Sequence, residues 1–247
     1  MPEAKNKTSK PEMGFFKTLA IALICAGFVR SFFFEPFHIP SGSMKPNLLI
    51  GDYIFVAKYS YGYSRYSFPF GLDLFEGRFW QKNKPQRGDV AVFRLPSNPD
   101  INYIKRVIGL PKDRIQVSDG VLYINEQKVE KTAGGSFEDV DSGIKIPIRK
   151  FVETLPSGKE MTVLDQLKTL QDNTGIYEGP DGHYFVMGDN RDNSQDSRFL
   201  EHVGYVPEEN FVGRATIIFF SAAKPIWQFW QWPSSIRFER ILNQING

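Results

Sequence analysis

One apolar segment, residues 15–34 (FFKTLAIALICAGFVRSFFF), constrains the chain more than any other feature. At about 1.5 Å per residue, its roughly 20 residues match a hydrocarbon core of about 30 Å. Only Lys17 and Arg30 interrupt it, near its ends, where long side chains reach the headgroups. A cleavable signal peptide is the alternative, but Arg30 and three phenylalanines stand where small residues should mark the cleavage site. The segment is therefore predicted to be an uncleaved, single-pass transmembrane anchor.

The charges beside this segment predict its orientation. Before the anchor, lysines outnumber acidic residues: Lys5, Lys7, Lys10 and Lys17 stand against Glu3 and Glu12. On the far side, Arg30 is followed by Glu35. The positive-inside rule then places residues 1–14 in the cytoplasm as a short tail, and everything after Phe34 outside.

Composition narrows the possible classes of protein. The 247 residues are 41% hydrophobic and 23% charged, which is ordinary for a globular protein. A formal net charge of +2, dispersed along the chain, does not indicate nucleic-acid binding, which normally needs a clustered basic face. The single cysteine, Cys25, lies inside the apolar segment, so the chain has neither an intrachain disulfide nor a CxxC motif. No cofactor or bound metal is expected.

The rest of the chain shows mainly β patterning. Short runs of β-branched and aromatic residues, separated by Gly and Pro turns, predict strands or hairpins at 48–59, 87–95, 101–110, 120–129, 183–189 and 213–220. Only residues 161–172 (MTVLDQLKTLQD) are predicted to be helical. These patterns indicate a β sandwich or barrel-like domain at 35–118 and 182–247, interrupted by a more polar inserted subdomain at 119–181.

Two aromatic stretches allow two interpretations. The residues are Tyr59, Tyr61, Tyr63, Tyr66, Phe68 and Phe70 in one loop, and Trp227, Phe229, Trp230 and Trp232 in another. They could pack in a core, or they could form a surface that dips into the membrane, because Trp and Tyr favour the headgroup zone. The sequence leaves both interpretations open.

A turn with two serines follows the anchor closely. In FHIPSGSMKPNL, residues 37–48, Ser41 and Ser43 flank a glycine, with a proline on either side. A serine hydroxyl is a weak nucleophile that needs a general base or another means of activation. The three histidines, His38, His183 and His202, match no triad signature, and no GxSxG elbow is present.

A lysine in the predicted strand YIKRV, residues 103–107, is the alternative base. Strand alternation puts Lys105 and Arg106 on opposite faces, so at least one cation meets apolar surroundings. Arginine does not deprotonate in proteins. Burial lowers the pKa of a lysine, by up to about 3–5 units when the side chain is fully buried. A strand lysine that merely extends to solvent is the competing interpretation.

A dense polar segment, GDNRDNSQDSR at 188–198, contains three aspartates, two arginines and two serines. It could be a solvated loop. It is not an EF-hand, because counting from Asp192 puts Ser197 at the sixth position and Val203 at the twelfth. Such density in a β protein indicates a network of Asp–Arg pairs that holds the loop in one geometry.

Together these stretches closely resemble bacterial type I signal peptidases. The matching segments are PSGSM.P.L, GDYIFV.K, GDV.VF, YIKRV.GLP.D, GDNRDNS.DSR and VP..N.VGRA, which run in family order across roughly residues 36–220. The resemblance implies a membrane-bound serine protease with a signal-peptidase-like β-sheet core. It also implies Ser43 as nucleophile and Lys105 as general base.

The same resemblance implies supporting roles. Ser41 would complete the oxyanion hole, Ser194 would orient the Lys105 amine, and Asp189 would pair with Arg106, while Asp196 and Arg198 brace the loop. The residues expected to line two shallow pockets for small side chains are Ile39, Pro40, Met44, Leu48, Ile54, Val92 and Ile104. Asn47 and Lys112 depart from the usual threonine and glycine of the family. The implied partners are signal peptides with Ala-x-Ala-like cleavage sites and the lipid bilayer, for a monomer in the bacterial cytoplasmic membrane.

Two other functions remain as alternatives. A membrane-tethered scaffold on a degenerate protease fold would share the anchor and the strands but would tolerate loss of Ser43 and Lys105. A self-cleaving repressor-type protease would share the Ser–Lys chemistry, but residues 1–36 contain neither a DNA-binding head nor a scissile Ala-Gly linker.

Overall fold

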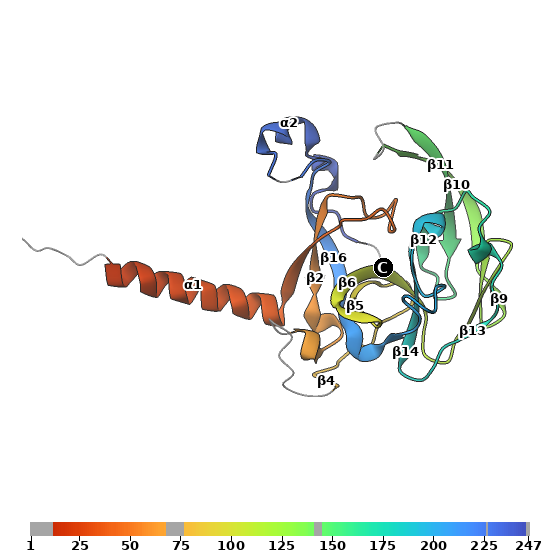
Figure 1. Cartoon of the computed structure of the whole chain (residues 1–247), viewed down its shortest axis with the longest axis horizontal. Helices are drawn as coiled ribbons and strands as arrows, with labels where there is room; N and C mark the ends of the chain where they lie inside the picture. Colours follow the sequence, from red (N-terminus) through yellow and green to blue (C-terminus); the bar gives the residue numbers. More distant parts are fainter. Residues whose placement is uncertain (1–11, 68–76, 141–144, 226, 246–247) are drawn as a thin grey trace, which may run out of the picture.

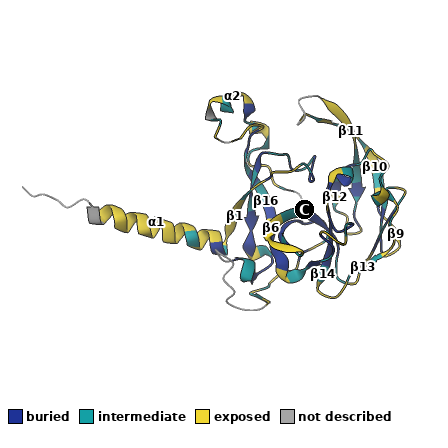
Figure 2. Ribbon diagram, viewed as in Figure 1, coloured by how far each residue is buried: buried dark blue, intermediate teal, exposed yellow. Residues whose placement is uncertain are grey.

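The computed structural model of the chain describes residues 12–67, 77–140, 145–225 and 227–245. Helix α1, Glu12–Phe32, extends away from a body built of strands (Figure 1). Nearly all of its described side chains are exposed (Figure 2). Within the described residues, α1 is the one helix long and apolar enough to span a membrane, with a mean hydropathy of 1.6 over Gly14–Phe32. It ends two residues earlier than the predicted anchor, because Phe34 already pairs in a strand.

A seven-stranded antiparallel sheet forms the centre of the body. In spatial order its strands are β1 (Phe34–His38), β2 (Asp52–Ala57), β16 (Phe211–Ser221), β5 (Val90–Leu95), β6 (Asn98–Gly109), β14 (His183–Met187) and β15 (Val206–Pro207). Strands from both ends of the chain therefore meet in one sheet, so that β1 and β16 lie on either side of β2.

Smaller sheets lie on the side of the body away from α1 (Figure 1). One contains β13 (Tyr177–Glu178), β7 (Arg114–Ser118), β8 (Val121–Ile124) and β9 (Gln127–Lys128); another contains β10 (Glu130–Asp139), β11 (Ile146–Thr154) and β12 (Glu160–Leu164). The pair β3 (Tyr63–Ser64) and β4 (Arg78–Phe79) lies elsewhere in the body.

The other helices within the described residues are short. They are α2 (Trp232–Ser235) and the 3-10 turns η1 (Lys58–Ser60), η2 (Arg65–Ser67), η4 (Leu170–Asp172), η5 (Arg191–Asn193), η6 (Glu208–Asn210), η7 (Phe229–Gln231) and η8 (Phe238–Arg240). The mainly β fold with one N-terminal apolar helix is thus confirmed.

The hairpin between β7 and β8 shows how local sequence sets the strand register. Its two turn residues, Asp119 and Gly120, have φ angles of 48° and 71°. A two-residue turn with both φ values positive matches the right-handed twist of paired strands, and Asp-Gly is among the sequences that tolerate it. Ser118 consequently pairs with Val121.

One helical prediction was wrong. Residues 160–164 form strand β12, which pairs with β11, and only Leu170–Asp172 make a single 3-10 turn. Met161 and Val163 face the core at a spacing of two, whereas Leu167 and Leu170, needed for an apolar helix face, are exposed. Pairing with the preceding strand β11, in a hairpin, outweighed a local apolar spacing that is also compatible with a helix.

Hydrophobic packing joins the smaller sheets to the central one. A buried cluster combines Ile108 and Phe185 of the central sheet with Ile115, Leu122 and Val163 of the smaller sheets. A second cluster lies beneath the turn after β1, and a third lies around Phe93 and Phe211. The serine turn is therefore supported by a core on its inner side.

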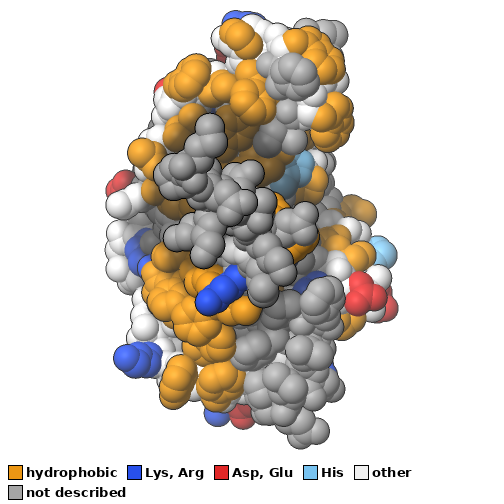
Figure 3. All heavy atoms as spheres, turned by 90° about the vertical axis from the view of Figure 1, so that its left-hand side faces the viewer, with side chains coloured by type: hydrophobic (Ala, Val, Ile, Leu, Met, Phe, Trp, Pro, Cys, Tyr) orange, Lys and Arg blue, Asp and Glu red, His pale blue; other side chains and the backbone are white. Residues whose placement is uncertain are grey.

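The two aromatic stretches differ in their surroundings. Tyr61 and Tyr63 are buried, so for them core packing is correct, whereas Tyr59, Trp227 and Trp230 are exposed. Phe68 and Phe70 lie outside the described residues. Viewed from the side of α1, hydrophobic side chains gather both near the top, where the C-terminal segment lies, and lower on the same face (Figure 3).

Candidate active site

The serine turn connects β1 to β2 at one edge of the central sheet. Backbone hydrogen bonds from Ile39 N to Asp52 O (2.9 Å) and from Gly51 N to Ile39 O (3.0 Å) close its base. Met44 and Leu48 are fully buried and anchor the turn in the core. Ser43 is thereby held with 8% of its surface exposed.

Lys105 lies in β6, which β2, β16 and β5 separate from β1 in the sheet, and its side chain reaches the serine. Its Nζ lies 2.7 Å from Ser43 Oγ and 3.0 Å from the Ile104 carbonyl oxygen, and the residue is 4% exposed. Burial lowers the pKa of Lys105 to about 8, although Asp196 and Asp189 counteract part of this effect. About one tenth of the amine is therefore neutral at pH 7, and this fraction is able to accept a proton.

An open groove of about 400 Å³ exposes these two side chains to solvent. Its lining includes Pro40, Ser41, Ser43, Tyr103, Ile104, Lys105, Asn193 and Gln195. Ser41 Oγ lies 3.4 Å from Ser43 Oγ, so two hydroxyls face the same space. The groove can therefore hold a peptide against both hydroxyls.

The apolar residues expected to line small pockets fall into two groups. Pro40 and Ile104 line the groove. The others are at most 2% exposed and form the core beneath the turn: Ile39, Met44, Leu48, Ile54 and Val92. Because they point inward from the turn, β2 and β5, they support the floor of the groove in this structure without opening into it.

The polar segment at 188–198 follows β14 and lies against the serine turn. Met187 pairs with Arg106 in the sheet, which brings Asp189 beside the guanidinium, and both carboxylate oxygens accept hydrogen bonds at 2.8 Å. Asp196 binds Arg198 in the same bidentate way, at 2.9 and 3.0 Å. Burial alone would raise the pKa of Asp196, but the charge and hydrogen bonds of Arg198 outweigh it and lower that pKa.

This segment also holds the nucleophile directly. Asn190 donates from its backbone N to Ser43 O (3.0 Å) and from its side chain to Gly42 O (3.1 Å). Gly188 packs so closely that a Cβ there would overlap Ser194 Oγ and come within 2.6 Å of Ser43 O. The turn is therefore fixed from two sides, by the core and by this loop.

Ser194 is buried near Ser43, but its hydroxyl does not form the expected hydrogen bond to Lys105. Its Oγ makes no hydrogen bond with geometry in the usual range, and Lys105 Nζ is oriented instead by the Ile104 carbonyl. The Tyr103 ring, 5.3 Å from Lys105 Nζ, adds a favourable cation–π contact.

Three contacts at the site were missed from the sequence. Lys45, two residues after Ser43, makes two bonds of 2.7 Å to the carboxylate of Asp139 in β10. Arg191 forms a buried bidentate pair with Glu153 of β11. Asn47 donates to Asp189 and to the Thr162 carbonyl oxygen. The partners lie 38 to 142 residues apart, so no local motif could indicate these pairs.

The C-terminal segment reaches back to the same turn. Arg240 binds both oxygens of the fully buried Asp52, at 3.1 and 2.6 Å, and donates to Asn47 O at 2.9 Å. Arg237 donates to Ile50 O at 2.7 Å. Asp52 in turn accepts from Leu49 N, so both arginines support the chain just after the nucleophile.

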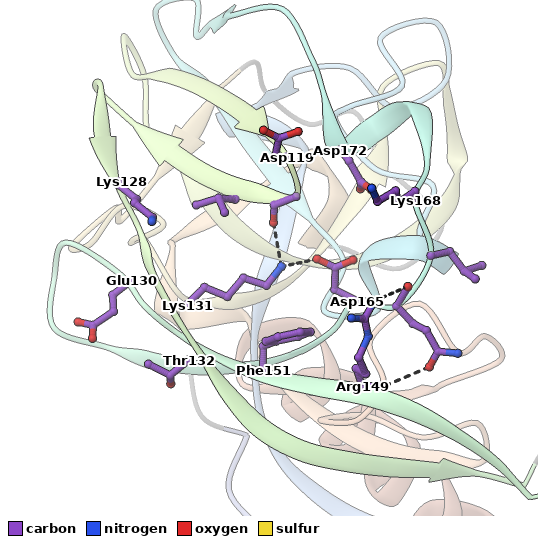
Figure 4. A pocket seen from close by; sticks show the side chains of 14 residues that line it. Asp119, Lys128, Glu130, Lys131, Thr132, Arg149, Phe151, Asp165, Lys168 and Asp172 are labelled. Atoms are coloured by element: carbon purple, nitrogen blue, oxygen red, sulfur yellow. Dashed lines mark hydrogen bonds and ion pairs between the residues drawn. The ribbon is translucent and has the colours of Figure 1, made fainter.

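A second hollow, of about 580 Å³, lies among the smaller sheets (Figure 4). Lys131 binds Asp165 and the Gly120 carbonyl oxygen there, and its ammonium lies over the Phe151 ring. Asp165, Asp172 and Asp192 could bring carboxylate oxygens within 4.8 Å of one another, but Lys131 already neutralises part of this charge. The hollow shares no lining residue with the groove at Ser43.

Comparison with known proteins identifies the family. The model of the family described as "Signal peptidase, peptidase S26" matches residues 13–220, most of the chain. The chain belongs to this signal peptidase family. Signal peptidase I of Rickettsia typhi is 42% identical over 97% of this chain and 95% of its own length, and that of Rickettsia prowazekii matches at the same identity and coverage.

Signal peptidase I of Enterococcus faecalis, known from a crystal structure, is 30% identical, with a TM-score of 0.31 over 53% of this chain and 97% of that one. The similarity to the rickettsial proteins extends over nearly the full chain, which confirms the resemblance to bacterial type I signal peptidases. The chain is accordingly a serine protease, and its apolar helix makes it a membrane-anchored one.

Proposed function

We propose that this signal peptidase removes N-terminal signal peptides from exported preproteins at the outer face of the cytoplasmic membrane, with Ser43 as nucleophile and Lys105 as general base. The observation that carries the proposal is the 2.7 Å distance between Lys105 Nζ and Ser43 Oγ in a buried, solvent-connected site. The names of the rickettsial relatives support the same reaction.

The first step is attack by the serine. A neutral Lys105 amine takes the proton of the Ser43 hydroxyl as Oγ forms a bond to the scissile carbonyl carbon, giving a tetrahedral intermediate. The amine is competent because burial has brought its pKa to about 8. An arginine in its place would remain charged and could not act as a base.

The oxyanion of this intermediate needs donors. We assign this role to the Ser43 backbone N–H and the Ser41 hydroxyl, which lies beside Ser43 Oγ on the groove. Preorganised donors of this kind are commonly the largest single source of transition-state stabilisation, about 3 kcal/mol for one donor. Ser41 thus stabilises the negative charge of the intermediate, while Ser43 forms the covalent bond to the substrate.

Collapse of the intermediate completes the cycle. The Lys105 ammonium returns its proton to the leaving amine, the signal peptide remains as an ester on Ser43, and the mature protein departs. Water then attacks the ester while Lys105 accepts one of its protons, and Lys105 returns this proton to Ser43 Oγ as the ester bond breaks, which releases the signal peptide and restores the hydroxyl and the neutral amine. The loop at 188–198 would keep Ser43 and Lys105 aligned through the Arg106–Asp189 and Asp196–Arg198 pairs.

Substrate choice and location follow from the same geometry. Pro40 and Ile104 give the groove an apolar wall suited to the small residues of an Ala-x-Ala-like site. Ser43 lies nine residues after Phe34, at most about 30 Å along the chain. Residues 35–118 and 182–247 would act as the catalytic domain of a monomer, with 119–181 inserted and the N-terminal tail in the cytoplasm.

The test is cleavage of one purified preprotein by the full chain in detergent, with sequencing of the new amino terminus. Wild type should release a mature protein whose new amino terminus directly follows a small residue of the preprotein sequence. Ser43→Ala and Lys105→Ala should be inactive. Ser157→Ala and Lys145→Ala, at exposed positions, are matched controls that should retain activity. Wild-type cleavage by Ser43→Ala would refute the proposal and favour the scaffold alternative.

A further inference from the structure

The end of α1 is attached to the catalytic body by specific hydrogen bonds. The last carbonyl groups of a helix lack partners within it and must find them elsewhere. Here Tyr63 Oη donates to Phe32 O at 2.6 Å, and Lys58 N donates to Phe33 O at 3.0 Å. The Phe32 and Tyr63 rings also meet edge to face, with centroids 5.5 Å apart. The body therefore caps the membrane helix.

Glu35 joins the same two parts through charge. One of its carboxylate oxygens accepts hydrogen bonds from Arg30 of α1, at 2.9 and 3.2 Å, and the other lies 2.7 Å from Lys58 Nζ. Lys58 is 3% exposed, and its Nζ also donates to Ser67 O at 2.7 Å. Removing one partner of a buried ion pair is strongly unfavourable, so this junction favours a single geometry.

No flexible linker separates the junction from the nucleophile. Strand β1 starts at Phe34 and pairs with β2 along its whole length, from Phe34 opposite Ala57 to His38 opposite Tyr53. The serine turn follows at once, closed at its base by Ile39 and Asp52. The position of Ser43 relative to α1 is therefore set by paired backbone.

We propose that Glu35, Lys58 and Tyr63 are positioning residues that fix the height of Ser43 above the bilayer and thereby select which bond of a membrane-inserted preprotein is cut. This inference rests on the proposed function. A signal peptide whose apolar core stays in the bilayer offers its peptide bonds at successive heights, about 3.3 Å apart in an extended chain. A tilt of the catalytic body that changed the height of Ser43 by a few ångströms would present a different peptide bond to Ser43.

The experiment uses the full chain in liposomes and two substrates. One is a preprotein with two Ala-x-Ala sites, three residues apart, after its apolar core. The other is a soluble peptide with one such site. Tyr63→Phe removes the hydroxyl that caps α1 but keeps the ring on Phe32, and Glu35→Gln weakens the ion pairs. Tyr59→Phe and Glu138→Gln are matched controls at exposed positions.

The junction variants should cleave the soluble peptide at a rate close to wild type. On the inserted preprotein, mass spectrometry should show the ratio of the two products changed by about fivefold, the population shift that one hydrogen bond is worth. The controls should leave this ratio unchanged.

An unchanged product ratio in Tyr63→Phe, with its peptide activity intact, would overturn the inference. Should Glu35→Gln fail to fold, Tyr63→Phe still decides, because it removes a single oxygen atom. Absence of cleavage of either substrate by wild type would instead refute the proposed function.

Discussion

Asn47 Nδ2 donates a hydrogen bond of 2.7 Å to Asp189 Oδ2, although the two residues are 142 positions apart. The same amide donates to the Thr162 carbonyl oxygen at 2.8 Å. The side-chain amide of Asn47 has two hydrogen atoms to donate, one for each of these acceptors. Asn47 therefore joins the serine turn, the Arg106–Asp189 pair and strand β12 at one point.

Replacing Asn47 should weaken this connection. Asn47→Ala removes the hydrogen bonds that the amide donates to Asp189 Oδ2 and to the Thr162 carbonyl oxygen. We expect this loss to lower the folding stability by about 1–3 kcal/mol. Denaturant unfolding of the full chain measures the change. Asn83→Ala, at an exposed position, should alter stability by less than about 0.5 kcal/mol. Equal stability of the two variants would contradict this interpretation.

The activity should depend on pH through Lys105. With a pKa of about 8, only about one tenth of the amine is neutral at pH 7, so kcat/KM should rise tenfold per pH unit below 8 and level off above it. The folded pKa lies below the usual lysine value of 10.5, so the unfolded chain binds more protons between these pH values and folding stability should also rise there. A pH–rate profile tests the first effect. Activity in Lys105→Arg would show that another group is the base.

Gly188 should not tolerate a side chain. In Gly188→Ala the added Cβ would overlap Ser194 Oγ and press on the Ser43 carbonyl oxygen, so the nucleophile should move. A misplacement of about 1 Å is sufficient to lower the rate by about a hundredfold. Gly175→Ala is the matched control, because no atom lies within 4 Å of its added Cβ. Steady-state kinetics would compare the two; similar kcat values would contradict the close packing.

The buried Arg191–Glu153 pair should contribute to stability through charge compensation. Glu153→Gln leaves the Arg191 guanidinium buried without its counter-ion, which we expect to destabilise the fold by about 3–5 kcal/mol. Glu138→Gln breaks an exposed pair with Lys145 and should cost at most about 1 kcal/mol. A smaller loss for Glu153→Gln than for Glu138→Gln, measured by thermal unfolding, would disagree with this assignment.

The exposed tryptophans should contact lipid. Trp227 and Trp230 are 69% and 63% exposed near α2, and the face that carries this segment also carries α1 (Figure 3). Alanine at both positions should weaken liposome binding of the body without α1, because tryptophan favours the headgroup region. Leu170→Ala, at an exposed position in η4, is the control. Unchanged binding of the tryptophan variant would rule out this contact.

Local patterns predicted most strands of the central sheet and the opposite facing of Lys105 and Arg106, because each depends on neighbours in sequence. Alternation places Lys105 and Arg106 on opposite faces of β6, and the structure shows one beside Ser43 and the other beside Asp189. The wrongly predicted helix at 161–172 shows the limit of such patterns. Its leucine spacing suited a helix, but pairing with β11 supplied the buried neighbours.

Long-range pairs could not be predicted. Lys45 looks like an ordinary polar residue of a turn until β10 brings Asp139 to it. Glu153 alternates along β11 like any strand residue, and only docking of the smaller sheet against η5 buries it beside Arg191. In both cases tertiary packing determines the partner, and the residues next to Lys45 or Glu153 in the sequence do not indicate which residue that partner is.

The hydrogen bonds between Arg240 and Asp52 determine where the chain can be truncated to make a soluble form of this enzyme for crystallisation. A truncation at residue 221 would retain all the residues that the family model matches, yet it would remove both guanidinium groups from the fully buried carboxylate of Asp52. The loosened residues would be those just behind the nucleophile. A shortened protein should therefore lose its membrane helix and keep its last helical turn.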